Sequence, residues 1–590
     1  MFVPLYTRTE IPIFCIPLFR YRRDSRTQKI ESNHKQAIEV LNSMASKRLR
    51  VIPLGGLGEV GRNMMAYEYD GEILIVDTGL MFPENDMLGI DYIIPDLTYL
   101  SERRLQVRGI IITHGHEDHI GAIHHVLQEV QAPIYATPLT RGLLEVKLAR
   151  NGMMGKAALN TVQAGDTVQI GPFQVEFFHV CHSIPDAVGL GIETPAGLVV
   201  HTGDYKFDHT PVDNWPSDYA KLAEFSRRGV LALFADSTNS ERPGWTPSER
   251  VIDSALEDVF QQAKGRIIIA SFASLVSRMQ QVANTALRHG RKLAFVGTSM
   301  IDNAKMARKL GYLDIPDSLL LPIDQAINLP DDEVAIMCTG SQGEPTSIMG
   351  RLSVGTNRLF DLKEGDTVVL SSHPIPGNEE NVYRTINRLF ERGADVIYEA
   401  IAPVHVSGHA SQEEMKLLVH LVRPKYFIPI HGEMRQLRQH AKLAQTVGIP
   451  EENIAVILNG QVLEFDNEQM RVTNARVPAA YVFVDGAGVG DMNPDVMRER
   501  ESLARDGVVM VNLTLDHSGH GLVGDPEILT RGFMMPREGD DLISQARSRV
   551  TETVSRANGN LKRDVEEAVR AFLYSETRRR PMVFVSLNRA

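Results

Sequence analysis

Three histidines and two carboxylates fall within six consecutive positions of the sequence, from His114 to His119. The cluster directly follows the apolar, β-favouring run 109–113, which is typical of a buried strand that leads into a metal-binding loop. Imidazole and carboxylate ligands together suit zinc or manganese. The motif H-x-H-x-D-H therefore predicts a divalent-metal centre at the end of a strand.

Further histidines and aspartates follow other predicted strands, at 173–178, 197–200 and 425–430. Because mixed α/β sheets collect functional residues at one edge, we expect these side chains to meet the first cluster in space. A carboxylate has two oxygens and can serve two cations, so an aspartate suits a bridging position. We predict that one metal is bound by His114, His116 and His182, and a second by Asp118, His119 and His431, with Asp204 as the bridge.

Some neighbouring residues receive other interpretations. Asp77 ends a predicted strand and is expected to orient a ligand through a hydrogen bond. His179 competes with His182 for the same metal, since both follow the strand 173–178. His124 and His125 lie on the helix predicted at 120–130 and are interpreted as structural or surface residues.

A literal G-x-G-x-x-G occurs from Gly56 to Gly61, with Asp77 at a suitable distance for a ribose-binding acid. A dinucleotide site needs a helix after the glycines, whereas 64–69 and 73–76 are predicted as two strands joined by an Asp70-Gly71 turn. An antiparallel hairpin does not build a dinucleotide site. We therefore interpret the glycines as tight-turn residues close to the metal centre.

Composition limits the class of protein. A chain of 590 residues is too long for one core, so two to four domains are expected. No run of 18 apolar residues is present, which argues against a membrane span. Three cysteines cannot form a disulfide framework, and this fits a reducing compartment such as the cytoplasm. A net charge of −12 argues against non-specific nucleic-acid binding through bulk charge.

From about residue 230 the pattern changes to alternating strands and helices. Thr246 to Glu249 resembles a capping box, which predicts a helix that starts there and buries one face between 251 and 260. A strand at 266–270, a helix at 274–288 and a strand at 292–296 then predict a parallel-sheet unit with its own core. Because the metal-site pattern returns at His431, this second domain is expected to be inserted into the first.

We expect six segments along the chain. They are an N-terminal extension without stable structure at 1–47, a first part of the metal-binding domain at 48–225, an inserted domain at 226–389, a second part of the metal-binding domain at 390–464, a linker at 465–499 and a small C-terminal α+β domain at 500–590.

These motifs resemble the metallo-β-lactamase superfamily, in the H-x-H-x-D-H motif and in the contexts of Asp77, His182, Asp204 and His431. Asp236 in Ala-Asp-Ser-Thr and His409 in Val-Ser-Gly-His resemble the β-CASP branch of nucleic-acid nucleases. The segments 340–345, 374–378, 572–574 and 577–582 resemble the bacterial ribonuclease J family in particular, whereas Cys181 stands where that family suggests Thr. The resemblance implies an α/β fold: a metallo-β-lactamase αββα sandwich with an inserted parallel-sheet β-CASP domain and a small C-terminal α+β domain.

The same resemblance implies a two-metal ribonuclease with 5′ to 3′ exonuclease activity on 5′-monophosphorylated single-stranded RNA, and an endonuclease mode. Such an enzyme acts in rRNA maturation and mRNA decay. Zinc is the expected metal and manganese the alternative. The family further implies a homodimer or homotetramer, RNA-decay partners and no membrane association.

The resemblance also implies catalytic roles. His409 is expected to stabilise the scissile phosphate or to protonate the leaving 3′-oxygen, with Asp236 as its partner and Asp118 as a further catalytic group. Short Ser and Gly loops present N–H and hydroxyl groups that suit a terminal phosphate. The candidates for this role are Gly340, Ser341, Ser371, Ser372, Ser407, Gly408 and His409.

Other functions are open at the level of the sequence. A DNA-directed nuclease of the same superfamily is the first alternative, and a small-ester or thioester hydrolase the second, although a small substrate gives no reason for the inserted domain. A non-catalytic RNA-binding or scaffold subunit is the third. The presence of every expected metal ligand argues against that last class.

Overall fold

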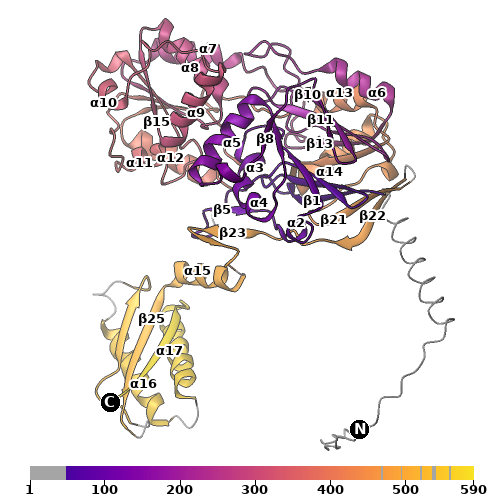
Figure 1. Ribbon diagram of the computed structural model, residues 1–590. Helices are drawn as coiled ribbons and strands as arrows, with labels where there is room; N and C mark the ends of the chain where they lie inside the picture. The colour runs from indigo at the N-terminus through magenta and orange to yellow at the C-terminus, as the bar shows by residue number, and fades with distance from the viewer. Residues whose placement is uncertain are drawn as a thin grey trace, which may run out of the picture.

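A computed structural model describes residues 48–84, 86–466, 469–492, 494–517, 521–534, 540–556 and 560–590. The N-terminal extension expected at 1–47 lies outside the described residues. A large body of packed sheets and helices carries the metal-site residues, and a smaller C-terminal unit lies apart from it (Figure 1). No helix in the described part of the chain is long and apolar enough to cross a membrane.

Two sheets pack face to face in the large body. The first has the order β22-β21-β1-β3-β4-β6-β7-β8, and the second β19-β13-β12-β11-β10-β9. Their facing side chains form one core, which includes Leu74 of β4, Phe177 of β10 and Phe234 of β13. The first sheet comprises β1 (Leu49–Gly55), β3 (Met64–Tyr69), β4 (Glu72–Val76), β6 (Val107–Ile111), β7 (Ile134–Ala136), β8 (Leu159–Thr161), β21 (Gln461–Asp466) and β22 (Gln469–Arg476). The second comprises β9 (Thr167–Ile170), β10 (Phe173–His179), β11 (Val188–Thr194), β12 (Gly197–His201), β13 (Val230–Asp236) and β19 (Tyr426–Ile430).

Helices cover both outer faces of this sandwich. The first sheet carries α2 (Thr98–Glu102), α4 (Ile123–Glu129) and α5 (Pro138–Arg150), and the second carries α6 (Tyr219–Arg228), α13 (Gln412–Val422) and α14 (Met434–Thr446). The expected αββα architecture is therefore confirmed. The helix predicted at 120–130 is divided into α3 (Glu117–Ile120) and α4, and β3 and β4 form the predicted hairpin, whose turn residues Asp70 and Gly71 have φ of 52° and 74°.

The inserted domain is a five-stranded sheet in which every pair of neighbours is parallel, as predicted. Its order is β15-β16-β14-β17-β18. The strands are β14 (Ile267–Ala270), β15 (Lys292–Val296), β16 (Val334–Cys338), β17 (Thr367–Leu370) and β18 (Asp395–Ile397). One face packs on α7 (Val251–Gln262), α8 (Val276–Arg288) and α9 (Thr298–Leu310), and the other on α10 (Ile323–Ala326), α11 (Ile348–Ser353) and α12 (Glu379–Glu391).

Strand pairing differs from the expected domain boundaries at three places. β13 pairs with β12 and β19, so it belongs to the sandwich although it lies within 226–389. β18 extends the inserted sheet beyond residue 390. β22 pairs with β21 inside the segment expected to be a linker. From this pairing we propose that the inserted domain runs from α7 to β18.

The predicted capping box at Thr246 to Glu249 is wrong. α7 starts at Val251 without a side-chain cap. The Thr246 hydroxyl donates instead to the backbone oxygen of His409, at 2.7 Å, and the Glu249 carboxylate accepts a hydrogen bond from Arg278, at 2.9 Å. Tertiary partners therefore replace the local backbone groups that a capping box would bind.

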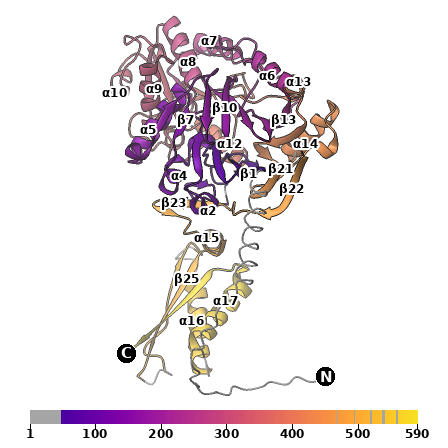
Figure 2. The same cartoon turned by 45° about the vertical axis from the view of Figure 1, so that its right-hand side comes forward.

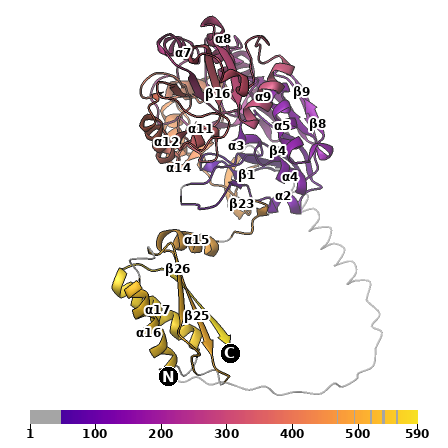
Figure 3. The same ribbon diagram turned by 90° about the vertical axis from the view of Figure 1, so that its left-hand side faces the viewer.

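The C-terminal unit is joined to the large body through a short sheet and one helix. β23 (Val482–Asp485) pairs with β5 (Tyr92–Ile94) and with β24 (Gly488–Val489), and α15 (Pro494–Asp506) follows (Figure 2). The unit itself has the sheet order β26-β25-β27, with β25 (Val508–Leu515), β26 (Glu527–Arg531) and β27 (Met582–Arg589). α16 (Asp540–Arg556) and α17 (Leu561–Thr577) lie side by side on one face of this sheet (Figure 3).

Candidate metal centre

The glycine-rich loop after β1 borders the site, as predicted. Gly56, Gly58 and Gly61 have φ of 89°, 80° and 115°, which glycine adopts without strain. Two short strands in this region, β2 (Leu57–Gly58) and β20 (Gly432–Glu433), pair in parallel and bring the loop beside His431. Asn63, at the end of the loop, lies 3.1 Å from Nε2 of His119.

His114, His116 and His182 form the first donor cluster. Nδ1 of His116 lies 3.1 Å from Nε2 of His114 and 3.1 Å from Nε2 of His182. The other nitrogens face the protein, since Nδ1 of His182 lies 2.8 Å from the Gly408 oxygen and Nδ1 of His114 lies 3.1 Å from Oγ1 of Thr113. Such outer contacts hold an imidazole in a ligand orientation.

Asp118, His119, Asp204 and His431 form the second donor cluster. Nε2 of His119 lies 3.5 Å from Oδ2 of Asp118 and 3.2 Å from Oδ2 of Asp204. Nε2 of His431 also lies 3.5 Å from Oδ2 of Asp118, whereas its Nδ1 lies 2.8 Å from Oδ1 of Asp204. One nitrogen of each histidine therefore points toward the Asp118 carboxylate.

One oxygen of Asp204 faces both clusters. Its Oδ2 lies 3.6 Å from Nε2 of His114 and 3.8 Å from Nε2 of His182, in addition to the contact with His119. This position between the clusters is the one expected of a bridging carboxylate.

Asp77 orients His119, a residue of the second donor cluster. Its Oδ2 lies 2.8 Å from Nδ1 of His119, and its Oδ1 accepts a hydrogen bond from the backbone N–H of Thr113, at 2.8 Å. Asp77 is buried and has a φ of 63°, which is strained for a residue other than glycine. The contacts with Thr113 and His119 fix the orientation of this carboxylate.

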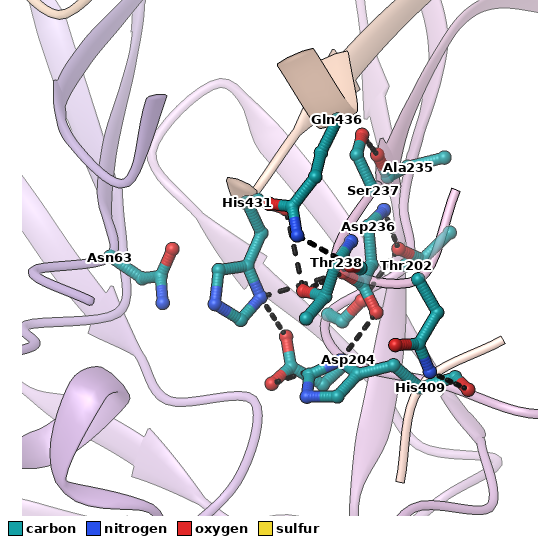
Figure 4. A network of polar contacts seen from close by, with 12 residues as sticks. Asn63, Thr202, Asp204, Ala235, Asp236, Ser237, Thr238, His409, His431 and Gln436 are labelled. Carbon is teal, nitrogen blue, oxygen red and sulfur yellow. Dashed lines mark hydrogen bonds and ion pairs between the residues drawn. The ribbon is translucent and has the colours of Figure 1, made fainter. Parts of the chain in front are cut away.

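Asp236 and His409 form a pair beside the two clusters. Nδ1 of His409 lies 2.7 Å from Oδ2 of Asp236, and the Thr238 hydroxyl donates to Oδ1 of Asp236, also at 2.7 Å. The imidazoles of His409 and His431 converge on the carboxylates of Asp204 and Asp236 (Figure 4). His409 lies between β18 and α13, in the segment through which the chain returns from the inserted domain to the sandwich.

The two clusters differ in protonation. Burial lowers the pKa of His114 and His182 well below the ordinary range and that of His116 to about 4, so these three imidazoles present neutral nitrogens. Burial opposes protonation of His431 as well, but Asp204 and Asp118 outweigh it and raise its pKa to about 10. Carboxylates that attract a proton so strongly attract a metal cation in the same way.

The residues fit two divalent cations. Nε2 of His431 is buried and lies 3.5 Å from Oδ2 of Asp118 without a well-formed hydrogen bond, so it is available to a cation placed beside that carboxylate. The clusters offer only imidazole nitrogens and carboxylate oxygens, the donors that zinc and manganese accept. His179 belongs to neither cluster, because its Nδ1 lies 3.0 Å from the Pro216 oxygen and its ring stacks on Trp215.

The Ser and Gly loops are only partly available to a ligand. The Ser371 hydroxyl donates to the Val404 oxygen at 2.6 Å, and the Ser372 hydroxyl donates to the Ser341 oxygen at 3.2 Å. The Ser407 hydroxyl accepts a hydrogen bond from Asn239, at 2.8 Å. Gly340 and Ser341 line a groove of about 350 Å³ that reaches Gly115, within the first metal motif.

Sequence reasoning missed several residues that shape the site. Asn63 contacts His119, and Thr238 binds Asp236, but neither residue type is diagnostic of a metal centre. Arg278 is buried behind Ser371, which accepts a hydrogen bond from its guanidinium. A cation on the buried face of α8, between Val276 and Met279, is the one signal that points to it.

Four segments of the chain match models of known protein families. Residues 57–240 match the metallo-beta-lactamase superfamily, and 393–456 match a Zn-dependent metallo-hydrolase RNA specificity domain. Residues 264–389 match the ribonuclease J beta-CASP domain, and 495–590 match the ribonuclease J C-terminal domain. Together with the two donor clusters, these matches define the chain as a metal-dependent nuclease of the metallo-β-lactamase superfamily.

Proteins that are similar to this chain over most of its length support the same class. Ribonuclease J2 of Bacillus subtilis is 42% identical over 91% of this chain and 98% of its own length. Ribonuclease J of Synechocystis is 43% identical over 92% of this chain and 87% of its own length. A crystal structure of a protein of unknown function from Enterococcus faecalis covers 71% of this chain and 100% of its own chain with a TM-score of 0.51 and 16% identity, which shows a shared fold alone. The chain belongs to the ribonuclease J family.

Proposed function

We propose that this protein hydrolyses single-stranded RNA, as a 5′ to 3′ exonuclease on 5′-monophosphorylated ends and also as an endonuclease. The observation that carries the proposal is the shared Asp204 oxygen between two donor clusters, with His409, from the segment that follows the inserted domain, beside it. The relatives named ribonuclease J and the match to an RNA specificity domain support RNA over DNA as the substrate. Roles in rRNA maturation and mRNA decay, with RNA-decay partners in the cytoplasm, follow from the same proposal.

The metal ligands in this proposal are those predicted from the sequence. His114, His116 and His182 hold one cation and Asp118, His119 and His431 the other, with Asp204 between them. When bound, two divalent cations clamp the scissile phosphate and lower the pKa of an attacking water. Zinc is the proposed metal, with manganese as the alternative for the same donor set.

His409 and Asp236 act on the phosphate. The Asp236 carboxylate holds Nδ1 of His409, which leaves Nε2 to face the substrate. In this orientation the imidazole stabilises charge on the phosphate oxygens or protonates the leaving 3′-oxygen. Asp118 contributes by fixing both His119 and His431 through one carboxylate.

The loops at the carboxyl ends of β14, β16 and β17 are proposed to read the 5′-phosphate. These strands are parallel, so their following loops meet at one edge of the inserted sheet, where ligands bind in α/β folds. The loops contain Gly340, Ser341, Ser371 and Ser372. Ser407 and Gly408, the other candidates, contact Asn239 and His182 instead. Backbone N–H groups carry this recognition, because several of the serine hydroxyls are engaged within the protein.

A time course on one RNA sequence tests the proposal. The RNA carries a 5′-monophosphate, triphosphate or hydroxyl, and product lengths are resolved with and without added metal. Fast, metal-dependent release of mononucleotides from the monophosphate form alone supports 5′ to 3′ exonuclease action. Equal cleavage of the matched DNA oligonucleotide would favour the DNA-directed alternative instead.

We also propose that a second copy of the chain binds to the open face of the C-terminal sheet. Leu529, Met510 and Phe584 are direct cross-strand neighbours there and are 42%, 45% and 49% exposed. Arg531 lies on one side of this row and Glu527 on the other along β26. A two-fold axis through the row would set Arg531 against Glu527 of the second copy, so the face is complementary to itself.

A further inference from the structure

Both tryptophans of the chain lie at the surface. Trp215 is 41% exposed and Trp245 is 48% exposed, although indole rings usually bury most of their area. Trp215 lies on the loop 202–218, which leaves β12 and carries Asp204. Trp245 lies on the loop 237–250, which leaves β13 directly after Asp236. Each tryptophan therefore belongs to a loop that starts at the metal centre.

The two loops are fastened to each other. The Ser248 hydroxyl donates to the Thr210 oxygen at 3.0 Å, and the backbone N–H of Glu249 donates to Asp208 at 3.0 Å. The Arg250 guanidinium bridges the loops further, because it donates to the Thr210 oxygen at 2.9 Å and to Asn214 at 2.6 Å. The two loops that carry the indoles are thus joined by several hydrogen bonds.

Three other rings pack beside the indoles, of which His179 is buried, Tyr219 is half-buried and His209 is exposed. The His179 ring stacks on Trp215, with ring centroids 3.9 Å apart and an angle of 5° between the planes, so that one indole face is covered. His209 lies 5.7 Å from Trp245 and 6.1 Å from Tyr219, centroid to centroid. We call these five residues the aromatic patch. The patch begins where α6 starts, and α6 packs beside α13 on the outer face of the second sheet (Figure 1).

The aromatic patch is continuous with the catalytic residues. Thr246, which follows Trp245, donates to the backbone oxygen of His409 at 2.7 Å. The thiol of Cys181, which precedes the ligand His182, lies 3.4 Å from the Trp215 oxygen. Both loops therefore run from the metal centre to the aromatic rings.

We propose that the aromatic patch is an accessory RNA-binding site, where nucleobases of single-stranded RNA stack outside the metal centre. The inference rests on the proposed function, that the substrate is RNA. Aromatic rings with nearby guanidinium groups are the usual means of holding single strands, and the Arg250 guanidinium lies between the two loops that carry the tryptophans. With a net charge of −12, the chain has no bulk positive charge to retain a long RNA, and stacking supplies affinity without it.

Stacking has a distinct signature. Every base has a π face, so the patch should favour longer RNA without strong preference for sequence. Loss of one stacking ring should raise the KM for a long RNA by roughly five- to a hundredfold. A mononucleotide, which fills only the metal centre, should gain little from the patch.

Intrinsic fluorescence tests the proposal directly, because the chain has only two tryptophans. Wild-type protein, Trp215→Phe and Trp245→Phe are titrated in chelator with an oligouridylate of about twelve nucleotides, a length typical of single-strand sites. Quenching in both single-tryptophan variants is the expected result, with far weaker quenching by uridine monophosphate. If the oligonucleotide binds, as measured by anisotropy of a labelled 3′ end, while neither tryptophan responds, the patch proposal is wrong.

Kinetics provide the second readout. Trp245→Ala should raise the KM for a long 5′-monophosphorylated RNA, and Trp245→Phe should restore most of the loss. Phe390→Ala is the matched control, since Phe390 is 46% exposed on α12, outside the aromatic patch. An unchanged KM in Trp245→Ala would overturn the patch and leave the proposed ribonuclease intact. Failure of the wild-type protein to cleave RNA would overturn the proposed function, while quenching would still decide the patch.

Discussion

The metal-binding edge of the sandwich and the open face of the C-terminal sheet are both built from strands, but they present opposite kinds of side chain. At the edge, strands end in buried histidines and aspartates, and each ring or carboxylate is aimed by a further contact such as that between Asp77 and His119. In the C-terminal unit, the open face of the sheet presents a row of exposed apolar side chains, Leu529, Met510 and Phe584. Buried polar groups at a strand end therefore indicate chemistry, whereas apolar groups on an open sheet face indicate association.

The comparison predicts that the two regions respond to different changes. A substitution at the edge should alter metal content or turnover and leave assembly intact. A substitution on the sheet face should alter assembly and leave metal content intact.

The largest effect is expected for His116→Ala. This change removes a nitrogen that faces both His114 and His182, and cleavage of RNA should fall more than about a hundredfold, beyond the effect of losing an outer contact. Metal per chain, measured by mass spectrometry of the purified protein, should fall with it. His179→Ala is the control: it competes with His182 in the sequence but lies outside both clusters, so its metal content should match that of the wild type.

Asp236→Asn should slow turnover by about 10- to 100-fold, because the neutral amide no longer holds His409 in its working orientation and charge state. Metal content should stay near that of the wild type. A loss of metal comparable to that of His116→Ala would instead make Asp236 a ligand and extend the second cluster by one residue.

The clustering of the candidate metal-site residues was predictable because they follow apolar strand runs, and parallel or mixed sheets bring such strand ends together. His431 lies far from His114 in sequence, yet both follow strands that end at the same edge of the sandwich. The family resemblance added the αββα architecture and the pairing of His409 with Asp236. The predicted turn at Asp70-Gly71 and the parallel sheet of the inserted domain depend only on local pattern, and both are confirmed.

Other features depend on tertiary partners and escaped prediction. The capping-box pattern at Thr246 to Glu249 is satisfied by His409 and Arg278, which no local rule identifies. The buried position of Arg278 and the contact between Asn63 and His119 follow from packing across distant elements. The exposure of both tryptophans could not be predicted from the sequence either, because tryptophan side chains are largely buried in most proteins.

Phe584→Asp tests the association side of the comparison. A charge in the apolar row, next to Met510 at its centre, should weaken self-association about thirtyfold or more, the effect of losing a buried anchor of an interface. Sedimentation velocity over a range of concentrations measures the change. Leu105→Asp is the matched control, since Leu105 is 84% exposed on the large body. Unchanged association of Phe584→Asp would place the dimer contact elsewhere.

Metal removal should separate the two regions thermally. Bound cations stabilise only the part of the chain that holds them, by about 4 kcal/mol when the metal is a thousandfold above its dissociation constant. Calorimetry of chelated protein should therefore show the melting transition of the large body lowered by several degrees, whereas the C-terminal unit, whose core is separate, melts as before. Readdition of zinc or manganese should restore the first transition. If both transitions shift together, the C-terminal unit is energetically coupled to the sandwich through α15. The metal-binding edge and the C-terminal sheet would then be independent only at the level of single side chains.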